Sequence, residues 1–446
     1  MSGVTRDYWV APASAISGRI AVPGDKSVSH RAVIFGAIAE GLTRVSGFLP
    51  GADTLATAAI LSSLGVAIDR VGHTELVIAG VGLHGLHGAD KALDCGNAGT
   101  AMRLLAGLLA GQKFESILIG DESLTRRPMR RVIDPLAKMG ANIESPTGTA
   151  PLRIRPVERL TAIDYLCPVA SAQIKSCVLL AGLYAEGTTR VTEPAATRDY
   201  TERMLAALGA DVRADGLSVE INPGRRLQAQ PIAVPGDFSS AAFFLVAGAI
   251  AQERPGAAQA HRELIIENVG LNPRRTGLLD CLLEMGADIE VLDPRTVAGE
   301  LVGDLRVRAS KLRGIEVPAA RVPDMIDEFP AFSIAAACAS GVSRITGAHE
   351  LRVKESDRLA AMAAGLKILG VTIEEYADGM AIEGREQLGG GSIDSRGDHR
   401  IAMSFAIAAL RASAAIEVRD CANVDTSFPG FAALAASCGI PIEVRD

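Results

Sequence analysis

A helix that ends at glycine and leads into a short apolar stretch recurs along this chain. Apolar residues share one face of each expected helix, and the segment after the glycine reads as a strand. A glycine at this point supplies the left-handed backbone conformation that commonly ends a helix. Copies of the pattern contain Gly65, Gly140, Gly209, Gly286 and Gly370, and a looser sixth copy contains Gly439.

Successive glycines of this series are 69 to 84 residues apart, which is longer than a solenoid repeat and typical of a small βαβαββ unit. A strand signature supports the same division, since Thr43-Arg-Val45, Thr189-Arg-Val191 and Ser343-Arg-Ile345 each lie two residues after a glycine. Helix ends with glycine are common punctuation, but five good copies at similar spacing favour a true repeat. The sequence therefore predicts six units.

A second duplication divides the chain into two halves. The segment Val22-Pro-Gly-Asp-Lys-Ser27 is echoed by Val234-Pro-Gly-Asp-Phe-Ser239, and an apolar helix pattern follows each copy. Pro-Gly ends the preceding strand, and the aspartate can cap the following helix. We expect an α/β protein of the α+β type with one domain at 24–236 and another at 1–23 and 237–446. The crossings, and a hinge, are expected near 22–25 and 234–238.

Composition narrows the class of protein further. The 446 residues are 48% hydrophobic and carry a formal charge of −7, which disfavours nucleic acid or an anionic membrane as partner. No apolar run is long enough to span a bilayer, and Arg6 and Asp7 lie where a signal peptide would have its apolar core. The seven cysteines include no pair at metal-ligand spacing, so we expect a reduced cytoplasmic protein without a metal.

Polar clusters precede several of the expected helices. A helix N-terminus offers unpaired N–H groups and partial positive charge to an anion. Ordinary capping explains any one cluster, but recurrence at the same end of successive units favours a shared anion site. The clusters are Gly24-Asp-Lys-Ser-Val-Ser-His-Arg31, Cys95-Gly-Asn-Ala-Gly-Thr-Ala-Met-Arg103, Ser171-Ala-Gln-Ile-Lys175, Thr197-Arg-Asp-Tyr200 and Gly397-Asp-His-Arg400.

Two further segments carry charge in an apolar context. In Leu351-Arg-Val-Lys-Glu-Ser-Asp-Arg358, a helix would place Lys354 and Arg358 on one face that invites a carboxylate or phosphate, although a solvated charged helix is the alternative. In Met325-Ile-Asp-Glu-Phe-Pro330, partly buried Asp327 and Glu328 could transfer protons. An acidic helix N-terminus accounts for these two residues equally well.

In order and along nearly the whole chain, these motifs resemble the 5-enolpyruvylshikimate-3-phosphate (EPSP) synthase family. The resemblance is carried by Pro23-Gly-Asp-Lys-Ser27 with Arg31, Gly96-Asn-Ala-Gly-Thr-Ala-Met-Arg103 and Leu351-Arg-Val-Lys-Glu-Ser-Asp-Arg358, with Asp398-His-Arg400 and Ser427-Phe-Pro429. It implies the two-domain enolpyruvyl transferase fold. Each domain would contain three βαβαββ units with threefold pseudosymmetry, an inside-out α/β barrel.

The resemblance also implies roles for individual residues. Lys26 would reach both substrates, shikimate 3-phosphate and phosphoenolpyruvate. Other shikimate 3-phosphate positions are Ser27, Arg31, Ser171, Ala172, Gln173, Arg198, Asp327 and Lys354. Other phosphoenolpyruvate positions are Asn97, Gly99, Arg127, Gln173, Arg358 and Arg400.

The expected reaction transfers the enolpyruvyl group to the 5-hydroxyl of shikimate 3-phosphate and releases phosphate. Asp327 would help to remove the hydroxyl proton, and Glu355, with Lys26, would protonate the methylene carbon. A tetrahedral ketal would then expel phosphate. The resemblance implies a monomer without a cofactor, whose domains close on the substrates and exclude water.

The sequence departs from the best-known form of the family in three places. Leu104 replaces a usual proline, Asp425-Thr-Ser-Phe-Pro lacks a lysine often found there, and Ser171–Lys175 with Thr197–Tyr200 resembles a divergent bacterial branch. That branch often tolerates glyphosate when alanine follows Asn-Ala. Here Gly99 leaves room for the inhibitor, so we expect sensitivity.

Two alternatives remain from the sequence alone. UDP-N-acetylglucosamine enolpyruvyl transferase shares the architecture but relies on a cysteine in a mobile loop, and no cysteine here lies in a comparable Gly/Pro-rich loop between arginines. A non-catalytic repeat protein that binds a phosphorylated metabolite would keep the basic residues. It would not need both Asp327 and Glu355.

Overall fold

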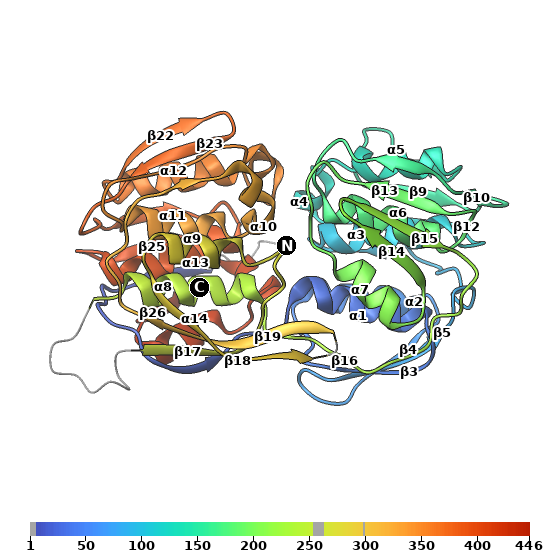
Figure 1. The fold of residues 1–446 in the computed structure, drawn as a ribbon, viewed down its shortest axis with the longest axis horizontal. Helices are drawn as coiled ribbons and strands as arrows, with labels where there is room; N and C mark the ends of the chain where they lie inside the picture. Colours follow the sequence, from blue (N-terminus) through green and yellow to red (C-terminus); the bar gives the residue numbers. More distant parts are fainter. Residues whose placement is uncertain (1–5, 253–262, 298) are drawn as a thin grey trace. The chain divides into compact units, whose positions relative to one another are not determined.

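The computed structural model describes residues 6–252, 263–297 and 299–446. The chain divides into two compact units. Unit 1 consists of Met1–Pro23 with Pro235–Asp446, and unit 2 is Gly24–Val234. Figure 1 labels the elements of both units.

The described residues form six four-stranded sheets, three in each unit, and all six share one pattern of pairing. The first strand is parallel to the second, the second is antiparallel to the third, and the third is antiparallel to the fourth. The same pattern in unit 1 and in the remaining sheet of unit 2 confirms the predicted six-fold repetition.

The sheets of unit 2, with strands in this order, are β16 (Ile232–Ala233), β3 (Glu40–Ser46), β5 (Leu76–Val81) and β4 (Ala67–Arg70); β6 (Leu93–Asp94), β7 (Ser116–Ile119), β9 (Leu152–Arg155) and β8 (Asn142–Glu144); and β11 (Asp164–Leu166), β13 (Thr189–Thr192), β15 (Ser218–Asn222) and β14 (Asp211–Asp215). The short strands β10 (Leu160–Thr161) and β12 (Ala185–Glu186) pair in parallel and form a separate two-stranded sheet. The late strand β16 completes the first sheet, so the unit is closed by its own C-terminal segment.

The sheets of unit 1 are β2 (Gly18–Ala21), β17 (Glu263–Gly270), β19 (Glu300–Arg308) and β18 (Asp288–Val297); β20 (Glu316–Val317), β21 (Val342–Ile345), β23 (Gly379–Glu383) and β22 (Thr372–Tyr376); and β24 (Gly391–Asp394), β25 (Ile416–Arg419), β1 (Asp7–Val10) and β26 (Ile442–Arg445). The N-terminal strands β1 and β2 thus complete two sheets whose other strands come from the second half of the chain.

Two helices accompany each sheet. The inner helices are α1 (Lys26–Ile38), α3 (Gly99–Ala110) and α6 (Ala172–Gly182) in unit 2, and α8 (Phe238–Ile250), α11 (Phe329–Ala337) and α13 (His399–Ala408) in unit 1. The outer helices are α2 (Ala52–Ser63), α5 (Arg130–Lys138), α7 (Tyr200–Ala207), α9 (Gly277–Glu284), α12 (Arg358–Ile368) and α14 (Phe431–Cys438). Short helices are α4 (Glu122–Thr125), α10 (Val322–Met325), η2 (Ala319–Arg321), η3 (His349–Val353), η4 (Ala409–Arg411) and η5 (Ala422–Thr426).

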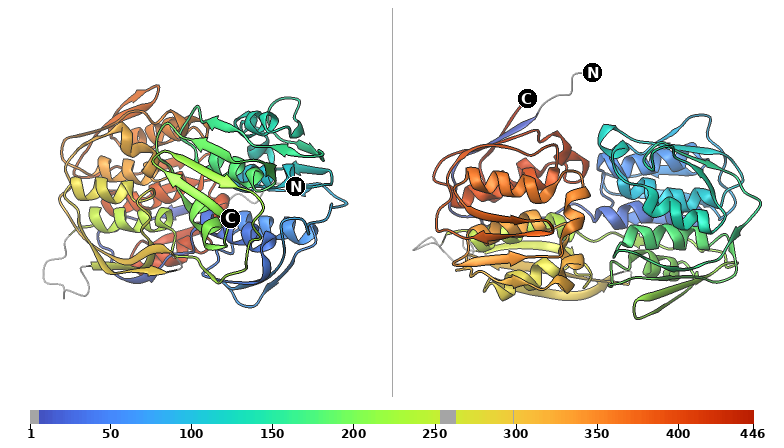
Figure 2. Two further views of the ribbon diagram at one scale, coloured as in Figure 1. Left: turned by 45° about the vertical axis from the view of Figure 1, so that its right-hand side comes forward. Right: turned by 90° about the horizontal axis from the view of Figure 1, so that it is seen from above.

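Within each unit the inner helices run through the middle and the sheets cover the outside (Figure 2). Every residue of α8 and of α11 is buried, because these helices are apolar on all sides. The strands alternate between buried and exposed positions, as in β21 and β25, so each sheet turns one face toward the helices. This arrangement confirms the predicted fold class, in which helices form the centre and strands the exterior.

The six predicted glycines end the six outer helices. Gly65, Gly140, Gly209, Gly286, Gly370 and Gly439 all have positive φ, between 82° and 116°. Residues other than glycine are strained at positive φ, so these positions select glycine. The repeat can therefore be recognised in the sequence. Among the described residues, each helix is too short or too polar to span a lipid bilayer.

Candidate functional site

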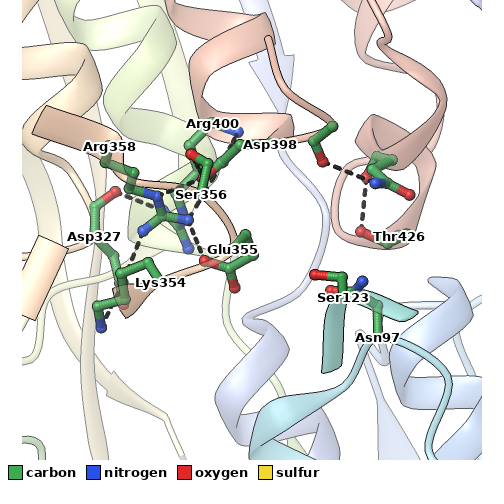
Figure 3. A network of polar contacts seen from close by, with 12 residues as sticks. Asn97, Ser123, Asp327, Lys354, Glu355, Ser356, Arg358, Asp398, Arg400 and Thr426 are labelled. Carbon is green, nitrogen blue, oxygen red and sulfur yellow. Dashed lines mark hydrogen bonds and ion pairs between the residues drawn. The ribbon is translucent and has the colours of Figure 1, made fainter. Parts of the chain in front are cut away.

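In unit 1, the polar cluster is organised around Arg358, the first residue of α12. Its side chain is completely buried. Nε donates a hydrogen bond to Oδ2 of Asp398 at 2.8 Å, and Nη2 donates to Oε2 of Glu355 at 2.6 Å. Nη1 lies 3.5 Å from Oδ1 of Asp327, so one guanidinium contacts three carboxylates (Figure 3).

These contacts keep the cluster ionised despite its burial. Burial opposes the charge of Arg358, but Asp398, Glu355 and Asp327 raise the pKa of its guanidinium above the ordinary value. Burial likewise acts to raise the pKa of Asp398, and Arg358 outweighs this effect and lowers that pKa below its ordinary value. A buried ion pair is favourable only when hydrogen bonds satisfy both partners. Here Ser356 and the backbone N–H of Arg400 also donate to Asp398.

Lys354 and Arg358 do not share a helix face, which corrects the helical interpretation of this segment. Residues His349–Val353 form η3, Lys354 is extended, and α12 begins only at Arg358 because Asp357 caps it by accepting from the N–H of Ala360. The two cations nevertheless meet at an acid, since Nζ of Lys354 lies 3.6 Å from Oδ1 of Asp327. Within the protein, the Asp327 carboxylate is therefore a negative partner of both cations.

Asp327 and Glu328 immediately precede α11. The Asp327 side chain is 14% exposed, while that of Glu328 is fully buried. Arg400, in the first turn of α13, donates from Nη1 to the backbone carbonyl of Asp327 at 2.9 Å. Asp327 is thus the accessible carboxylate of this pair, and helices α11, α12 and α13 position it together.

The segment Asp425-Thr-Ser-Phe-Pro, which lacks the lysine often found in the family, lies at the end of η5. Thr426 donates to the carbonyl of Asn423 at 2.7 Å (Figure 3), and Asp425 forms an ion pair with Arg6. The Ser427 side chain is buried. This segment consequently offers no cation of its own in the place of that lysine.

In unit 2, Lys26 is the first residue of α1, which Asp25 caps by accepting from the N–H of Val28. Nζ of Lys26 lies 2.5 Å from Oδ2 of Asp53, a buried carboxylate in the first turn of α2. Ser27 follows and is half-buried. An anionic ligand at Lys26 would therefore compete with Asp53 for the ammonium group.

Arg31 lies one turn further along α1 and is buried. Its guanidinium donates to Oγ1 of Thr201 and Oγ of Ser176, both at 2.8 Å, and to the carbonyl of Ser27 at 2.9 Å. Burial lowers the pKa of Arg31 to about 10. These bonds use three of the five N–H groups of the guanidinium. They fix the Arg31 side chain near the first turn of α1, where it contacts the carbonyl of Ser27.

The N-terminus of α3 carries the next group of predicted residues. Asn97 donates to Oδ2 of Asp121 at 2.7 Å and accepts from Arg127, which also donates to Oγ of Ser123 at 3.2 Å. Gly99 is the first residue of α3, and a Cβ added to it would lie 3.1 Å from Nη1 of Arg127 and 3.4 Å from Nη1 of Arg103. The absence of a side chain at Gly99 thus permits the close approach of both guanidinium groups.

Gln173 connects the N-termini of α3 and α6. Its side-chain oxygen accepts from Arg103, and its nitrogen donates to Oγ1 of Thr100 at 2.8 Å. Ser171 is the N-cap residue of α6 and Ala172 begins the helix, so both lie at its positive end. The predicted phosphate residues Ser171, Ala172 and Gln173 are thereby adjacent to the predicted α3 residues.

Arg198 lies in the loop before α7, and buried charges hold this loop on α6. Nζ of Lys175 contacts Oε2 of Glu193 and Oε1 of Glu202, both at 2.7 Å, and Thr197 donates to Glu193 at 2.6 Å. Burial acts to lower the pKa of Lys175, but the two glutamates raise it above its ordinary value. Lys175 is therefore a charged link between the Ser171–Gln173 turn and the loop that carries Arg198.

The structure also identifies residues that the sequence reasoning did not assign. Asp53 is the partner of Lys26, Arg103 orients Gln173, and Asp398 orients Arg358. Arg103 and Asp398 lie inside motifs that resemble those of the family, so the sequence could have indicated both residues. Nothing in the sequence pairs Asp53 with Lys26, because 27 positions separate them.

The side chains suit anions and proton transfer better than metal or thiol chemistry. Within the described parts of the chain, no group of three or more His, Cys, Asp or Glu side chains is placed to hold a metal ion. All seven cysteines are buried, and burial raises the pKa of thiols such as Cys95 and Cys281. Helix N-termini with Lys and Arg can bind phosphate or carboxylate groups, and Asp327 and Glu355 can accept or donate protons.

Comparison with known proteins gives one consistent result. The family model described as EPSP synthase (3-phosphoshikimate 1-carboxyvinyltransferase) matches residues 10–434. A 3-phosphoshikimate 1-carboxyvinyltransferase of Alkalilimnicola ehrlichii is 57% identical over 99% of this chain and 97% of its own length. One of Methylococcus capsulatus is 57% identical over 98% of both chains. The solved EPSP synthase of Acinetobacter baumannii superimposes with a TM-score of 0.88 at 48% identity, covering 99% of this chain and 100% of that chain.

Proposed function

Because this chain belongs to the EPSP synthase family, it catalyses the transfer of the carboxyvinyl group of phosphoenolpyruvate to shikimate 3-phosphate, and we propose that the residues described above perform this reaction. The observation that carries the proposal is the unit 1 cluster, in which Arg358 contacts Asp327 and Glu355. The reaction belongs to the shikimate pathway of aromatic amino-acid biosynthesis.

The reaction proceeds by addition and elimination. In the addition, the 5-hydroxyl oxygen forms a bond to C2 of phosphoenolpyruvate while C3 gains a proton, which gives a tetrahedral ketal. In the elimination, the bond from C2 to the phosphate oxygen breaks, phosphate leaves, and C3 loses a proton. Each substrate carries a phosphate and a carboxylate, so the enzyme must supply several cations and N–H donors.

We propose that Asp327 accepts the proton of the 5-hydroxyl and that Glu355, with Lys26, transfers the proton at C3. Asp327 is supported by its partial exposure and by the nearby cations of Lys354 and Arg358, which favour the ionised carboxylate. The role of Glu355 is supported by two observations. Arg358 holds its Oε2 atom in place, and the side chain is still 25% exposed, so the carboxyl group is accessible. General acid–base catalysis of this kind contributes about 10²–10⁴-fold to a rate.

We further propose that the binding residues divide by substrate. Shikimate 3-phosphate would contact Lys26, Ser27, Arg31, Ser171, Ala172, Gln173, Arg198, Asp327 and Lys354. Phosphoenolpyruvate would contact Lys26, Asn97, Gly99, Arg127, Gln173, Arg358 and Arg400. In unit 2 this division is supported by the helix N-termini of α1, α3 and α6, which carry most of both sets.

The chain crossings at 22–25 and 234–238 are proposed as the hinge of the enzyme. The division of the fold at Pro23/Gly24 and at Val234/Pro235 supports this proposal.

We also propose a cytoplasmic monomer. Light scattering should then give one species of 46.4 kDa, and a species of twice this mass would exclude the monomer.

Phosphate release tests the activity and its main alternative together. We expect release when the protein is mixed with shikimate 3-phosphate and phosphoenolpyruvate, and no release when UDP-N-acetylglucosamine replaces shikimate 3-phosphate. The buried cysteines support this expectation, because the alternative relies on a cysteine in a mobile loop. Release with the sugar nucleotide alone would exclude the assignment, and release with neither would indicate a binding protein.

Gly99→Ala tests the phosphoenolpyruvate and glyphosate proposals. The added methyl group would lie 3.1 Å from Nη1 of Arg127, so the guanidinium must shift. We expect the KM for phosphoenolpyruvate and the glyphosate concentration for half-inhibition each to rise about tenfold or more, as for one misplaced methyl group in a binding site. Steady-state kinetics measures both values. Thr125→Ala, in the neighbouring short helix α4, is the control and should change neither.

A further inference from the structure

The second copy of the duplicated Pro-Gly-Asp motif holds the side chain of an arginine, Arg275. Both aspartates cap an inner helix, since Asp25 accepts from the N–H of Val28 and Asp237 accepts from the N–H of Ser239. The second oxygen of Asp25 accepts from the hydroxyl of Tyr200 at 3.2 Å. Asp237 instead forms an ion pair with Arg275 at 2.8 Å. The unit 1 copy therefore holds a cation at the N-terminus of α8.

Arg275 occupies a turn between β17 and α9, where its N–H donates to the carbonyl of Asn272 at 2.8 Å. Its side chain is only 3% exposed. Nη2 also donates to Oγ of Ser239 at 2.6 Å, and Ser239 in turn donates to Oε1 of the fully buried Glu328. The motif thus connects Arg275 to the residue next to Asp327.

The same guanidinium also faces Asp327 directly. Nη1 of Arg275 lies 3.7 Å from Oδ2 of Asp327 and 3.7 Å from Oε1 of Glu328. On the other side, Oδ1 of Asp327 lies 3.6 Å from Nζ of Lys354 and 3.5 Å from Nη1 of Arg358. Each oxygen of this carboxylate therefore has its own cationic neighbour, and Arg275 is the one placed on the Oδ2 side.

The neighbours differ in how far solvent and ligands can disturb them. The Lys354 side chain is 28% exposed, whereas Arg275 is buried and hydrogen-bonded to Asp237 and Ser239. A buried charge is screened less by water and salt than an exposed one. Arg275 should therefore act on Asp327 in a constant way throughout turnover, even if Lys354 moves to contact a substrate.

We propose that Arg275 is a positioning residue that keeps the Asp327 carboxylate ionised and oriented, and that the Asp237, Ser239 and Glu328 contacts hold Arg275 in place for this purpose. The inference rests on the proposed role of Asp327 as the group that accepts the hydroxyl proton. Arg275 itself touches no reacting atom in this proposal.

The test is the pH profile of kcat/KM for shikimate 3-phosphate in Arg275→Met, Arg275→Lys and the control Arg274→Met. Arg274 is the neighbouring residue, and its ion pair with Asp324 at 3.2 Å is partly exposed. Arg275→Met removes a positive charge that favours the ionised Asp327, so the acid limb should move to higher pH by about one unit. Arg275→Lys should leave the limb near its wild-type position but lower kcat, because the ammonium group lacks the planar fork. Arg274→Met should behave as wild type.

A lower activity in Arg275→Met with an unmoved acid limb would overturn the inference, because a merely structural role predicts that result. If this variant does not fold, Asp237→Asn decides the question, since asparagine can still cap α8. The side-chain oxygen of asparagine can also still accept the hydrogen bond from Nη2 of Arg275 and keep it in place. Removing the negative charge beside Arg275 should then move the limb toward lower pH. An unmoved limb, or a move toward higher pH, would overturn the inference.

A fourth variant separates this inference from the proposed function. Asp327→Asn should lose most of its turnover, and Arg275→Met should no longer move the acid limb in that background. If Asp327→Asn keeps wild-type turnover, the proposed role of Asp327 fails and Arg275 cannot act through it. If Asp327→Asn is inactive but Arg275→Met has a wild-type profile, only the inference about Arg275 fails.

Discussion

Glu355→Gln should lower kcat by about 10²–10⁴-fold while the affinity for shikimate 3-phosphate changes little. Glutamine has nearly the same shape and can still accept the hydrogen bond that Nη2 of Arg358 donates to Glu355 at 2.6 Å. It cannot carry a proton to or from C3 of phosphoenolpyruvate. The loss should therefore appear in the chemical steps, which single-turnover measurements separate from binding.

Glu375→Gln is the matched control for this substitution. Glu375 forms an ion pair with Arg352 at 3.0 Å on the outer strand β22 and has no proposed role in the reaction. Its replacement should leave kcat and shikimate 3-phosphate affinity at wild-type values. Equal losses of turnover and affinity in Glu355→Gln would instead show that Glu355 maintains the structure of the cluster.

Arg358→Met should lower the free energy of unfolding by about 3–5 kcal/mol, the largest loss of stability expected among the substitutions considered for this protein. The substitution leaves the buried Asp398 without its main partner and removes a cation from Asp327 and Glu355. Urea unfolding, monitored by tryptophan fluorescence, measures the stability of unit 1, which contains Arg358. Trp9 is the single tryptophan, and it lies in β1 of unit 1, as Arg358 lies in α12 of unit 1.

Arg352→Met provides the control, because its pairs with Asp357 and Glu375 are partly exposed and should contribute only about 0–1 kcal/mol. A loss in Arg358→Met no larger than in Arg352→Met would show that the buried cluster does not stabilise unit 1.

The dependence of the Arg358→Met deficit on pH has a definite sign. In the wild type, the pKa of Asp398 is below its ordinary value of 3.8, so its ionised form adds stability above that pH and loses it as the pH falls through the folded-state pKa. In the variant, the effect of burial on Asp398 is no longer outweighed, so protonation relieves the cost. The deficit should therefore be largest near neutral pH, begin to shrink as the pH falls toward 3.8, and continue to shrink below it as wild-type Asp398 is protonated.

Local sequence determined the repeated part of this fold. Gly65, Gly140, Gly209, Gly286, Gly370 and Gly439 mark the units because a positive φ at the end of a helix selects glycine. Asp25 and Asp237 signalled helix starts because a carboxylate cap acts on N–H groups two or three residues away. These signals involve neighbouring residues, so they can be seen without tertiary structure, as can motifs that resemble those of a known family.

The segment around Lys354 shows where local reasoning failed. A helical spacing was considered for Lys354 and Arg358, but Asp357 starts the helix one residue before Arg358 and leaves Lys354 extended. The common acid was found at Asp327, 27 positions before Lys354. Asp327 is therefore a negative partner that both cations share within the protein. Their contacts with the substrates stay a prediction.

Only the tertiary structure decided which charges are partners. Arg275 meets Asp237 and Asp327 across separations of 38 and 52 positions, and Arg358 meets Asp398 across 40. Each contact forms because packing within unit 1 brings the N-termini of inner helices α8, α11 and α13 close to the N-terminus of α12 and to the turn before α9. The sequence thus determined the repeats, the caps and the candidate residues through short-range chemistry. The packing of distant segments within one compact unit determined which charges neighbour those residues and how they are oriented.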